Sequence, residues 1–139
     1  MRAAIEEAEK SRCDRAHVGC VIVDNETGQI VSRAFNETIE GSKPCDTGGH
    51  YMVDGHCKNT IHAELGSIIN LIKGGEEGLG EYTLYTTHYP CPGCSVAIAL
   101  CPEITKVVYL NDYDNSPLAT IRLEELPKGV HHAEPEVGA

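Results

Sequence analysis

The most restrictive feature of the sequence is the order of predicted strands and helices in its second half. Residues 81–87 have the pattern of a strand, and residues 106–110 have that of a buried strand. The segment between them, residues 92–100, is predicted to be a helix because it is apolar and opens with a proline. Parallel neighbours in a sheet need a long crossover, usually a helix. The alternation therefore predicts a sheet that contains parallel pairs and carries helices on its faces.

The first half of the chain contains signals for two helices and a hairpin. Residues 1–10 place apolar side chains at helical spacing with acids between them, which predicts a short amphipathic helix. Residues 18–24 and 29–35 are β-branched runs on either side of an Asn-Glu-Thr-Gly segment, and this pattern predicts a hairpin. Thr60 is predicted to cap a second helix that ends near Lys73, before a pair of glycines.

The composition is that of a single globular domain. The chain has 139 residues, of which 41% are hydrophobic and 23% charged, so disordered and fibrous classes are disfavoured. A chain of this length buries roughly two thirds of its unfolded surface and can form one core. The longest apolar stretch, residues 96–100, is far shorter than the ~20 residues of a membrane span, and the acidic N-terminal segment does not resemble a signal peptide. We therefore expect a cytoplasmic protein with no membrane partner.

The net charge limits the partners further. The chain has 21 acidic residues against 11 lysines and arginines, which gives a formal charge of −10. A protein that binds a polyanion normally displays a basic stripe, so duplex nucleic acid and tRNA are disfavoured as partners. A small phosphorylated substrate is compatible with this charge, because one or two local cations are enough to bind a phosphate.

Cysteine and histidine are abundant, with seven of each. In a chain without a secretory signal this favours metal ligation over disulfides. Cys20 and Cys101 lie in apolar surroundings and are interpreted as buried thiols that bind no metal. Residues 41–58 contain Gly, Pro, Asp, Cys and His without an apolar period, so we expect a loop that is held by something other than a hydrophobic core.

Two short motifs carry the chemistry. His62-Ala63-Glu64 lies just inside one predicted helix, and Pro90-Cys91-Pro92-Gly93-Cys94 lies at the start of another. Two thiols on the first turn of a helix are close together, and the positive end of the helix favours their deprotonated form, which binds metals. With His62 as the third ligand, a zinc ion keeps one position open for water, as catalytic zinc sites do. Zinc lowers the pKa of such a water to about 7.

The pattern H-x-E followed by P-C-x-x-C is typical of zinc-dependent nucleobase deaminases. Glu64 is then the candidate catalytic residue, since it lies two residues after the His62 ligand and can meet the water without binding the metal. It can carry a proton from the water to the ring N3, and then a proton to the departing amine. The alternative is a structural zinc site in which Glu64 is a surface residue. Structural sites usually have four ligands, and only three stand out here.

With these residues in place, the chain resembles the cytidine deaminase superfamily, and within it the deoxycytidylate deaminases of the bacterial late-competence and phage type. The resemblance covers residues 11–114. It is carried by Ser11-Arg12-Cys13, Val18-Gly19, Asn36, Cys57, residues 60–64, residues 84–91, Lys106-Val107-Val108-Tyr109 and Tyr113. The function that it implies is the hydrolysis of dCMP to dUMP and ammonia, with no redox cofactor.

The resemblance also implies an architecture. The family has a three-layer α/β/α sandwich around a mixed five-stranded sheet, and it usually assembles as a hexamer, so we expect a homo-oligomer. We expect residues 1–126 to form a single zinc-dependent deaminase domain that includes the loop 41–58. Residues 127–139, which contain Gly, Pro and Glu, are expected to form a mobile C-terminal tail.

The substrate contacts are also implied by the resemblance. The asparagine at the position of Asn36 contacts the sugar in related enzymes, and the backbone at Ala63 contacts the pyrimidine carbonyl. Tyr113 is expected to line the nucleotide pocket, and Arg15 or Arg12 to meet the 5′-phosphate through a forked contact. For each of the last two roles the alternatives, a packed tyrosine and a solvated arginine, stay open.

A second, structural zinc is expected to hold the loop 41–58. Burial of its few apolar residues cannot offset an ordering entropy of about 1–2 kcal/mol per residue, whereas a structural zinc contributes about 10 kcal/mol or more. Related deaminases of this type carry such a metal. The resemblance assigns the ligands Cys13, Cys45, His50 and Cys57, with His56 as an alternative. A disulfide or free thiols are the competing interpretations.

The sequence departs from the family pattern in two places. Ala34-Phe35-Asn36-Glu37 stands where family members commonly have Gly-Tyr-Asn-Gly, and Asn59 stands where they have arginine. The second glycine belongs to the region that binds the allosteric nucleotide, so regulation by dCTP and dTTP stays open. Three other functions also stay open: deamination of 5-methyl or 5-hydroxymethyl dCMP, a tRNA adenosine deaminase, and a non-enzymatic zinc-binding module. The acidic charge disfavours the tRNA enzyme.

Overall fold

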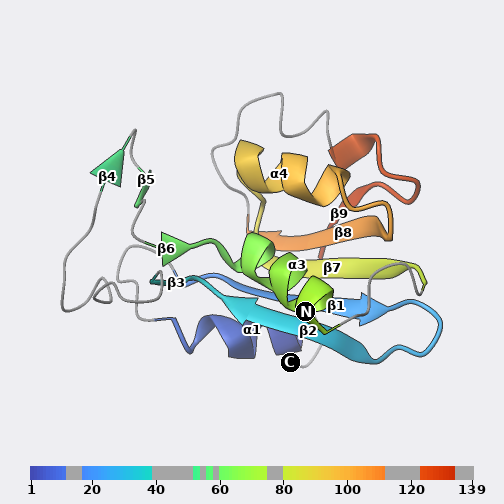
Figure 1. The fold of residues 1–139 in the computed structure, drawn as a ribbon, viewed down its shortest axis with the longest axis horizontal. Coiled ribbons are helices and arrows are strands. Elements are labelled where there is room, and N and C mark those ends of the chain that lie inside the picture. Colours follow the sequence, from blue (N-terminus) through green and yellow to red (C-terminus); the bar gives the residue numbers. More distant parts are fainter. Residues whose placement is uncertain are drawn as a thin grey trace.

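A computed structural model of the protein describes residues 1–11, 17–38, 52–53, 56–57, 60–74, 80–111 and 123–133. For residues 37–38, 52–53, 56–57 and 60 it describes the backbone only. The centre of the fold is a five-stranded sheet with the order β2-β1-β7-β8-β9 (Figure 1). The strands are β1 Gly19–Asp24, β2 Ile30–Phe35, β7 Tyr82–His88, β8 Ile104–Asn111 and β9 Val130–His132.

The sheet is mixed. β1 pairs antiparallel with both β2 and β7, while β8 lies parallel to β7 and to β9. The predicted hairpin is confirmed, and its turn places Gly28 at φ 73°, a left-handed conformation that glycine adopts at little cost. The predicted parallel crossover is confirmed too, because the helix α4 (Pro92–Ala99) connects β7 to β8.

Helices cover both faces of this sheet. On one face α1 (Arg2–Ala8) crosses β1 so closely that a Cβ on Gly19 would lie 2.0 Å from the carbonyl oxygen of Ala4. The next residue, Cys20, points to the other face, where its Sγ is 3.2 Å from the Ser67 Oγ of α3 (Ala63–Lys73). α4 packs beside α3 on that second face (Figure 1). No helix among the described residues has the length and apolar character needed to cross a membrane.

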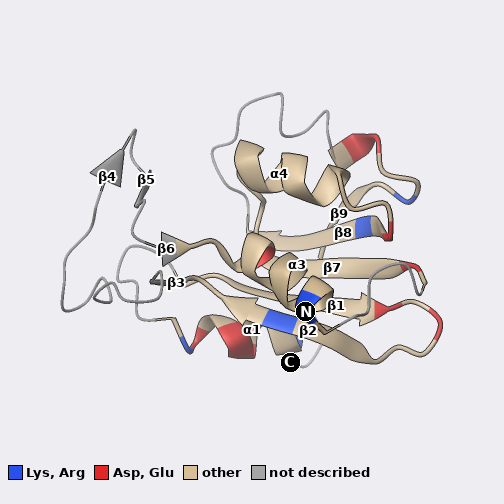
Figure 2. Cartoon of the chain, in the orientation of Figure 1, with Lys and Arg blue, Asp and Glu red and all other residues tan. Residues whose placement is uncertain are grey.

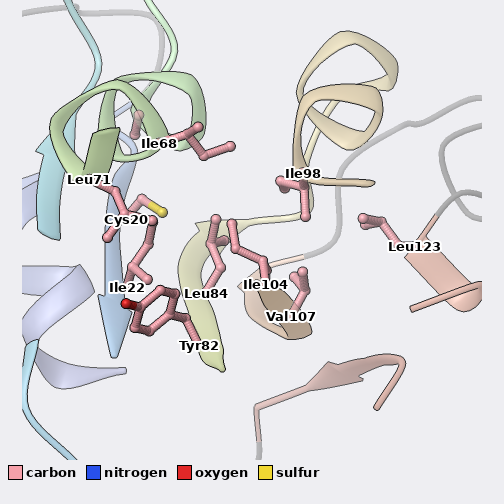
Figure 3. Packing of buried hydrophobic residues seen from close by; sticks show 11 residues of the cluster. Cys20, Ile22, Ile68, Leu71, Tyr82, Leu84, Ile98, Ile104, Val107 and Leu123 are labelled. Atoms are coloured by element: carbon pink, nitrogen blue, oxygen red, sulfur yellow. The ribbon is translucent and has the colours of Figure 1, made fainter. Parts of the chain in front are cut away.

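These layers confirm the predicted three-layer α/β/α fold. The core lies between the sheet and the α3 and α4 layer (Figure 3). Ile68 and Leu71 reach it from α3 and Ile98 from α4, and they belong to one cluster with strand residues such as Leu84. Cys20 is fully buried in this cluster as a free thiol, as the sequence indicated. The cluster consists of Cys20, Ile22, Ala63, Ile68, Leu71, Tyr82, Leu84, Ile98, Ile104, Val107 and Leu123.

Two short pairings lie beside the main sheet. β3 (Glu37–Thr38) pairs antiparallel with β6 (Thr60–Ile61), and β4 (Met52–Val53) pairs antiparallel with β5 (His56–Cys57). The segment 41–58, which was expected to be irregular, therefore contains one short pair of antiparallel strands. The expectation that Thr60 caps a helix is wrong, since Thr60 lies in β6 and α3 begins at Ala63 with His62 as its N-cap.

The expectation of a tail beyond Pro127 is also wrong for part of its range. Val130–His132 form β9, which extends the sheet beside β8. Gly129 adopts φ 73° just before this strand, and the amide of Val107 donates a hydrogen bond to its carbonyl over 3.1 Å. The two histidines of β9 are exposed at the edge of the sheet, where polar residues cost little. Residues 134–139 of the expected tail lie outside the described residues.

Candidate metal centre

Two helix starts build the site. His62 is the N-cap of α3 and Cys91 is the N-cap of α4, and both have extended backbones, with φ −66°, ψ 146° and φ −67°, ψ 168°. Neither side chain caps its own helix. Pro92 at the first position of α4 favours a helix start there, and it places Cys94 on the first turn, three residues after Cys91. Both helices therefore present metal-binding side chains at their first turns.

The donor atoms of these side chains converge. His62 Nδ1 is 3.4 Å from Cys91 Sγ and 3.3 Å from Cys94 Sγ, and the three atoms all lie within 4.8 Å of one another. A tetrahedral zinc with ordinary bond lengths separates a nitrogen and a sulfur ligand by roughly 3.5 Å. The three residues therefore fit one zinc ion, and they provide three of its four ligands.

The pKa values of the two thiols shift in opposite directions. Hydrogen bonds with the Cys94 thiol and then with His62 lower the pKa of Cys91, although burial opposes this. The same hydrogen bond with Cys91, together with burial, raises the pKa of Cys94. The pair of thiols therefore loses one proton readily, and a cation such as zinc is needed for it to lose the second.

Glu64 lies beneath this cluster. It is 4% exposed, and its Oε1 accepts a hydrogen bond of 2.8 Å from Thr86 Oγ1 on β7. Burial raises its pKa, while hydrogen bonds with the Thr86 hydroxyl and the Cys94 thiol and the charge of His62 lower it. The carboxyl is thus next to the three ligands without being one of them. This position suits a group that exchanges protons with a molecule at the metal.

The structure describes only some of the residues that the sequence places at the substrate or at a second zinc. Asn36 is buried directly after β2, where its Oδ1 accepts from the Val18 amide at 3.0 Å and its carbonyl accepts from Ser11 Oγ at 3.0 Å. Ala63 is fully buried between His62 and Glu64. The described part of the chain does not include Arg12, Cys13, Arg15, Cys45, His50 or Tyr113. His56 and Cys57 lie in β5, where only the backbone is described.

Thr86 is a site residue that the sequence interpretation missed. Strand alternation places it on the same face as Tyr82 and Leu84, which point into the core beneath α3 and α4. The signal in the sequence was a hydroxyl at a position where strand alternation, in register with Tyr82 and Leu84, predicts a buried apolar side chain.

The basic side chains of the described ranges lie on separate elements. Lys and Arg occur on or just after α1, on β2, α3 and β8, and in the segment before β9 (Figure 2).

Known proteins are similar to this chain in sequence and in fold. The family model described as the cytidine and deoxycytidylate deaminase zinc-binding region matches residues 1–111. The chain is 35% identical over 125 residues to ComE operon protein 2 of Bacillus subtilis strain 168, covering 90% of this chain and 64% of that protein. It is 29% identical over 147 residues to the deoxycytidylate deaminase of Enterobacteria phage T2, covering 78% and 76%.

A solved structure shares the fold over nearly the whole chain. It is a dCMP deaminase from the cyanophage S-TIM5 in complex with dCMP and dUMP, with a TM-score of 0.77 and 29% identity. The match covers 95% of this chain and 92% of that one. By contrast, this chain spans just under two thirds of the length of the Bacillus relative, 64%.

Proposed function

The chain belongs to the cytidine and deoxycytidylate deaminase zinc-binding family, and from this premise we propose that it hydrolyses dCMP to dUMP and ammonia. The observation that carries the proposal is the convergence of His62, Cys91 and Cys94 above the buried carboxyl of Glu64. The similarity to deaminases named for deoxycytidylate supports the choice of substrate.

The proposed reaction replaces the C4 amine of the cytosine ring with an oxygen from water. His62 Nδ1, Cys91 Sγ and Cys94 Sγ hold the zinc, which when bound acts as a Lewis acid and lowers the pKa of water at its open position. Glu64 accepts a proton from the attacking water and delivers it to N3 as the bond to C4 forms. It then takes the proton of the new C4 hydroxyl and passes it to the amine, which leaves as ammonia when the C4–N bond breaks and the C4 carbonyl forms. Glu64 Oε1 is engaged by Thr86, so Oε2 is the oxygen that we assign to this proton transfer.

Other residues are proposed to hold the nucleotide. Asn36 contacts the sugar, the backbone of Ala63 contacts the pyrimidine carbonyl, and Tyr113 lines the pocket. Arg15 or Arg12 binds the 5′-phosphate through a charge-assisted fork. The position of Ala63 in the chain, between a proposed ligand and the proposed proton carrier, supports its role.

A substrate panel tests this function. Cytidine, deoxycytidine, dCMP, 5-methyl dCMP, 5-hydroxymethyl dCMP and a tRNA adenosine substrate are compared by kcat/KM, with ammonia release as the readout. We expect dCMP to be preferred over deoxycytidine. Equal efficiency on these two would contradict phosphate recognition, and the absence of turnover on every compound would favour a non-enzymatic zinc module. Adding dCTP or dTTP to the dCMP assay tests regulation.

A second zinc is proposed to hold residues 41–58 through Cys13, Cys45, His50 and Cys57, or His56 in place of one ligand. Two-residue strands such as β4 and β5 are marginal on their own, which supports the need for a further crosslink. Metal analysis of the purified protein is expected to give two zinc ions per chain, and one in a Cys45→Ser, Cys57→Ser double variant. A single zinc in the unchelated wild type would refute this site.

We also propose that the chain forms a homo-oligomer, up to the hexamer typical of the family. Exposed apolar side chains on one face of α3 support this: Leu65 is 39%, Ile69 36% and Ile72 49% exposed. Light scattering after size-exclusion chromatography tests the state. A monomer at micromolar concentration would contradict the proposal.

A further inference from the structure

A hydroxyl on the central sheet is bonded to the carboxyl that the reaction uses. Thr86 is fully buried, and its Oγ1 donates to Glu64 Oε1 over 2.8 Å. The same oxygen is 3.0 Å from the carbonyl of His88. A hydroxyl has one proton, and an ionised carboxylate is the stronger acceptor of the two. The proton therefore goes to Glu64 when Glu64 is charged.

The backbone that carries this hydroxyl cannot shift easily. Thr86 lies in the interior of β7, where it is paired with Cys20 on β1 and with Tyr109 on β8. A residue bonded to strands on both sides has little freedom, and threonine is restricted about χ1. The donor is consequently fixed by the sheet and not by the helix that carries Glu64.

The helix side of the contact is fixed as well. Ser67 Oγ donates to the carbonyl of Glu64 over 2.8 Å, and Ser32 Oγ on β2 donates to the carbonyl of Ser67 over 2.6 Å. Ser67 is fully buried and Ser32 nearly so. These bonds hold the first turn of α3 against the sheet. The Glu64 side chain thus starts from a fixed backbone and ends at a fixed donor.

We propose that Thr86 is the positioning residue for Glu64: its hydroxyl engages Oε1 and thereby directs Oε2 toward the metal ligands. The inference rests on the proposed deaminase function, in which Oε2 exchanges the protons. Thr86 itself touches neither the metal ligands' donor atoms nor the substrate in this role. It acts only through the orientation of the carboxyl.

The hydroxyl serves both protonation states of the carboxyl. It can donate to Oε1 of the carboxylate, and it can still donate to Oε1 when Oε2 carries the proton, because the carbonyl oxygen of a carboxylic acid is also an acceptor. Glu64 therefore keeps a hydrogen-bond partner both before and after it takes a proton.

The test uses a matched set of variants of the zinc-loaded protein. Thr86→Val removes the hydroxyl with almost no change of shape, whereas Thr86→Ser keeps the hydroxyl. Thr83→Val is the control, because Thr83 is a buried threonine on the same strand whose hydroxyl instead donates to Asn25 Oδ1 over 2.5 Å. For each protein, kcat and KM for dCMP, zinc content and a crystal structure are measured.

We expect Thr86→Val to lower kcat by about 10- to 100-fold, with KM within about threefold and zinc content unchanged. Thr86→Ser and Thr83→Val should keep kcat within about fivefold of the wild type. In the crystal structures, the Glu64 carboxyl should turn away from its wild-type orientation in Thr86→Val and keep it in Thr86→Ser. An unchanged kcat in Thr86→Val, or a Glu64 carboxyl that stays in place, would overturn the proposal.

The two proposals fail in different ways. If the wild type releases no ammonia from dCMP, the proposed function is wrong, and the crystal structures alone decide whether Thr86 orients Glu64. If the wild type is active and Thr86→Val is equally active, the function stands and the positioning role is wrong.

Discussion

The first turns of α3 and α4 build the metal centre together, but they are held by different means. The start of α3 is fixed by protein hydrogen bonds, from Thr86 to the Glu64 side chain and from Ser67 to the Glu64 carbonyl. The start of α4 brings two thiols together beside His62. Its own side-chain bond, from Ser95 Oγ to the Pro90 carbonyl, is longer at 3.3 Å.

This difference assigns separate tasks to the two helices. α3 places a proposed ligand, His62, and the proposed proton carrier, Glu64, at positions that protein hydrogen bonds define without metal. α4 places two sulfurs whose joint ionisation is unfavourable until a cation lies between them. The metal is therefore expected to order the start of α4 more than that of α3, and chemistry is expected to depend on groups that α3 holds.

The largest effect on activity is expected from the loss of a zinc ligand on α4. Cys94→Ser removes one of the three protein ligands, so zinc should be lost. Deaminase activity should then fall below detection, because the reaction needs the metal. Metal analysis and the dCMP assay measure this. Cys101→Ser is the control, because Cys101 lies outside the cluster and its thiol donates to Glu103. Full zinc content in Cys94→Ser would contradict the ligand assignment.

In the α3 half, Glu64→Gln should separate metal binding from chemistry. We expect zinc content to stay at the wild-type level while kcat falls roughly 10²- to 10⁴-fold, because the proton carrier is lost. Glu7→Gln serves as the control: Glu7 is also buried, but it pairs with Lys10 at 2.9 Å and Arg33 at 3.5 Å on the opposite face of the sheet. Turnover within a few fold of the wild type in Glu64→Gln would refute its role.

The buried side chains of the two helices should affect the free energy of unfolding much more than they affect kcat. Leu71 of α3 and Ile98 of α4 are both fully buried. Leu71→Ala and Ile98→Ala should each lower the free energy of unfolding by about 2–5 kcal/mol, measured by urea denaturation of the zinc-loaded protein. The kcat of the folded protein should change by less than about tenfold. A stability loss below about 1 kcal/mol in either variant would contradict the core described above.

The smallest expected effect is on hydrogen exchange at two backbone amides, one in the first turn of each helix. The Gly66 amide donates to the carbonyl of His62 over 2.9 Å, and the Ser95 amide donates to the carbonyl of Cys91 over 2.8 Å. After chelation, hydrogen exchange at Ser95 should accelerate by roughly tenfold more than at Gly66, because only the α4 start loses its restraint. Equal acceleration at both amides would remove the proposed difference between the helices.

Much of this arrangement could be predicted from the sequence. Strand and helix periodicity located the hairpin, α4 and the parallel crossover, and the spacing within each motif placed His62 beside Glu64 and Cys91 beside Cys94. The meeting of these two pairs depends on tertiary packing, which short-range patterns do not encode. The family resemblance supplied that link, and the distances between the donor atoms agree with it.

Other features could not be predicted because tertiary contacts override local preference. Thr60 is a good capping residue, yet its backbone pairs with Thr38, and the helix begins after His62, whose side chain faces the two sulfurs. β9 is short and carries two exposed histidines, so it lacks the alternation that identifies a strand. Thr86 showed only an isolated hydroxyl in an apolar pattern, and its partner is distant in the sequence.

The stoichiometry of the reaction with dCMP tests most directly whether the site of His62, Cys91, Cys94 and Glu64 is a deaminase centre. Zinc-loaded protein is incubated with dCMP, and dUMP and ammonia are quantified by chromatography and an enzyme-coupled assay, with Glu64→Gln at the same zinc content as the blank. We expect dUMP and ammonia to form in equal amounts and over many turnovers, and the blank to form almost none. Protein that binds zinc at His62, Cys91 and Cys94 but converts no dCMP would contradict this assignment.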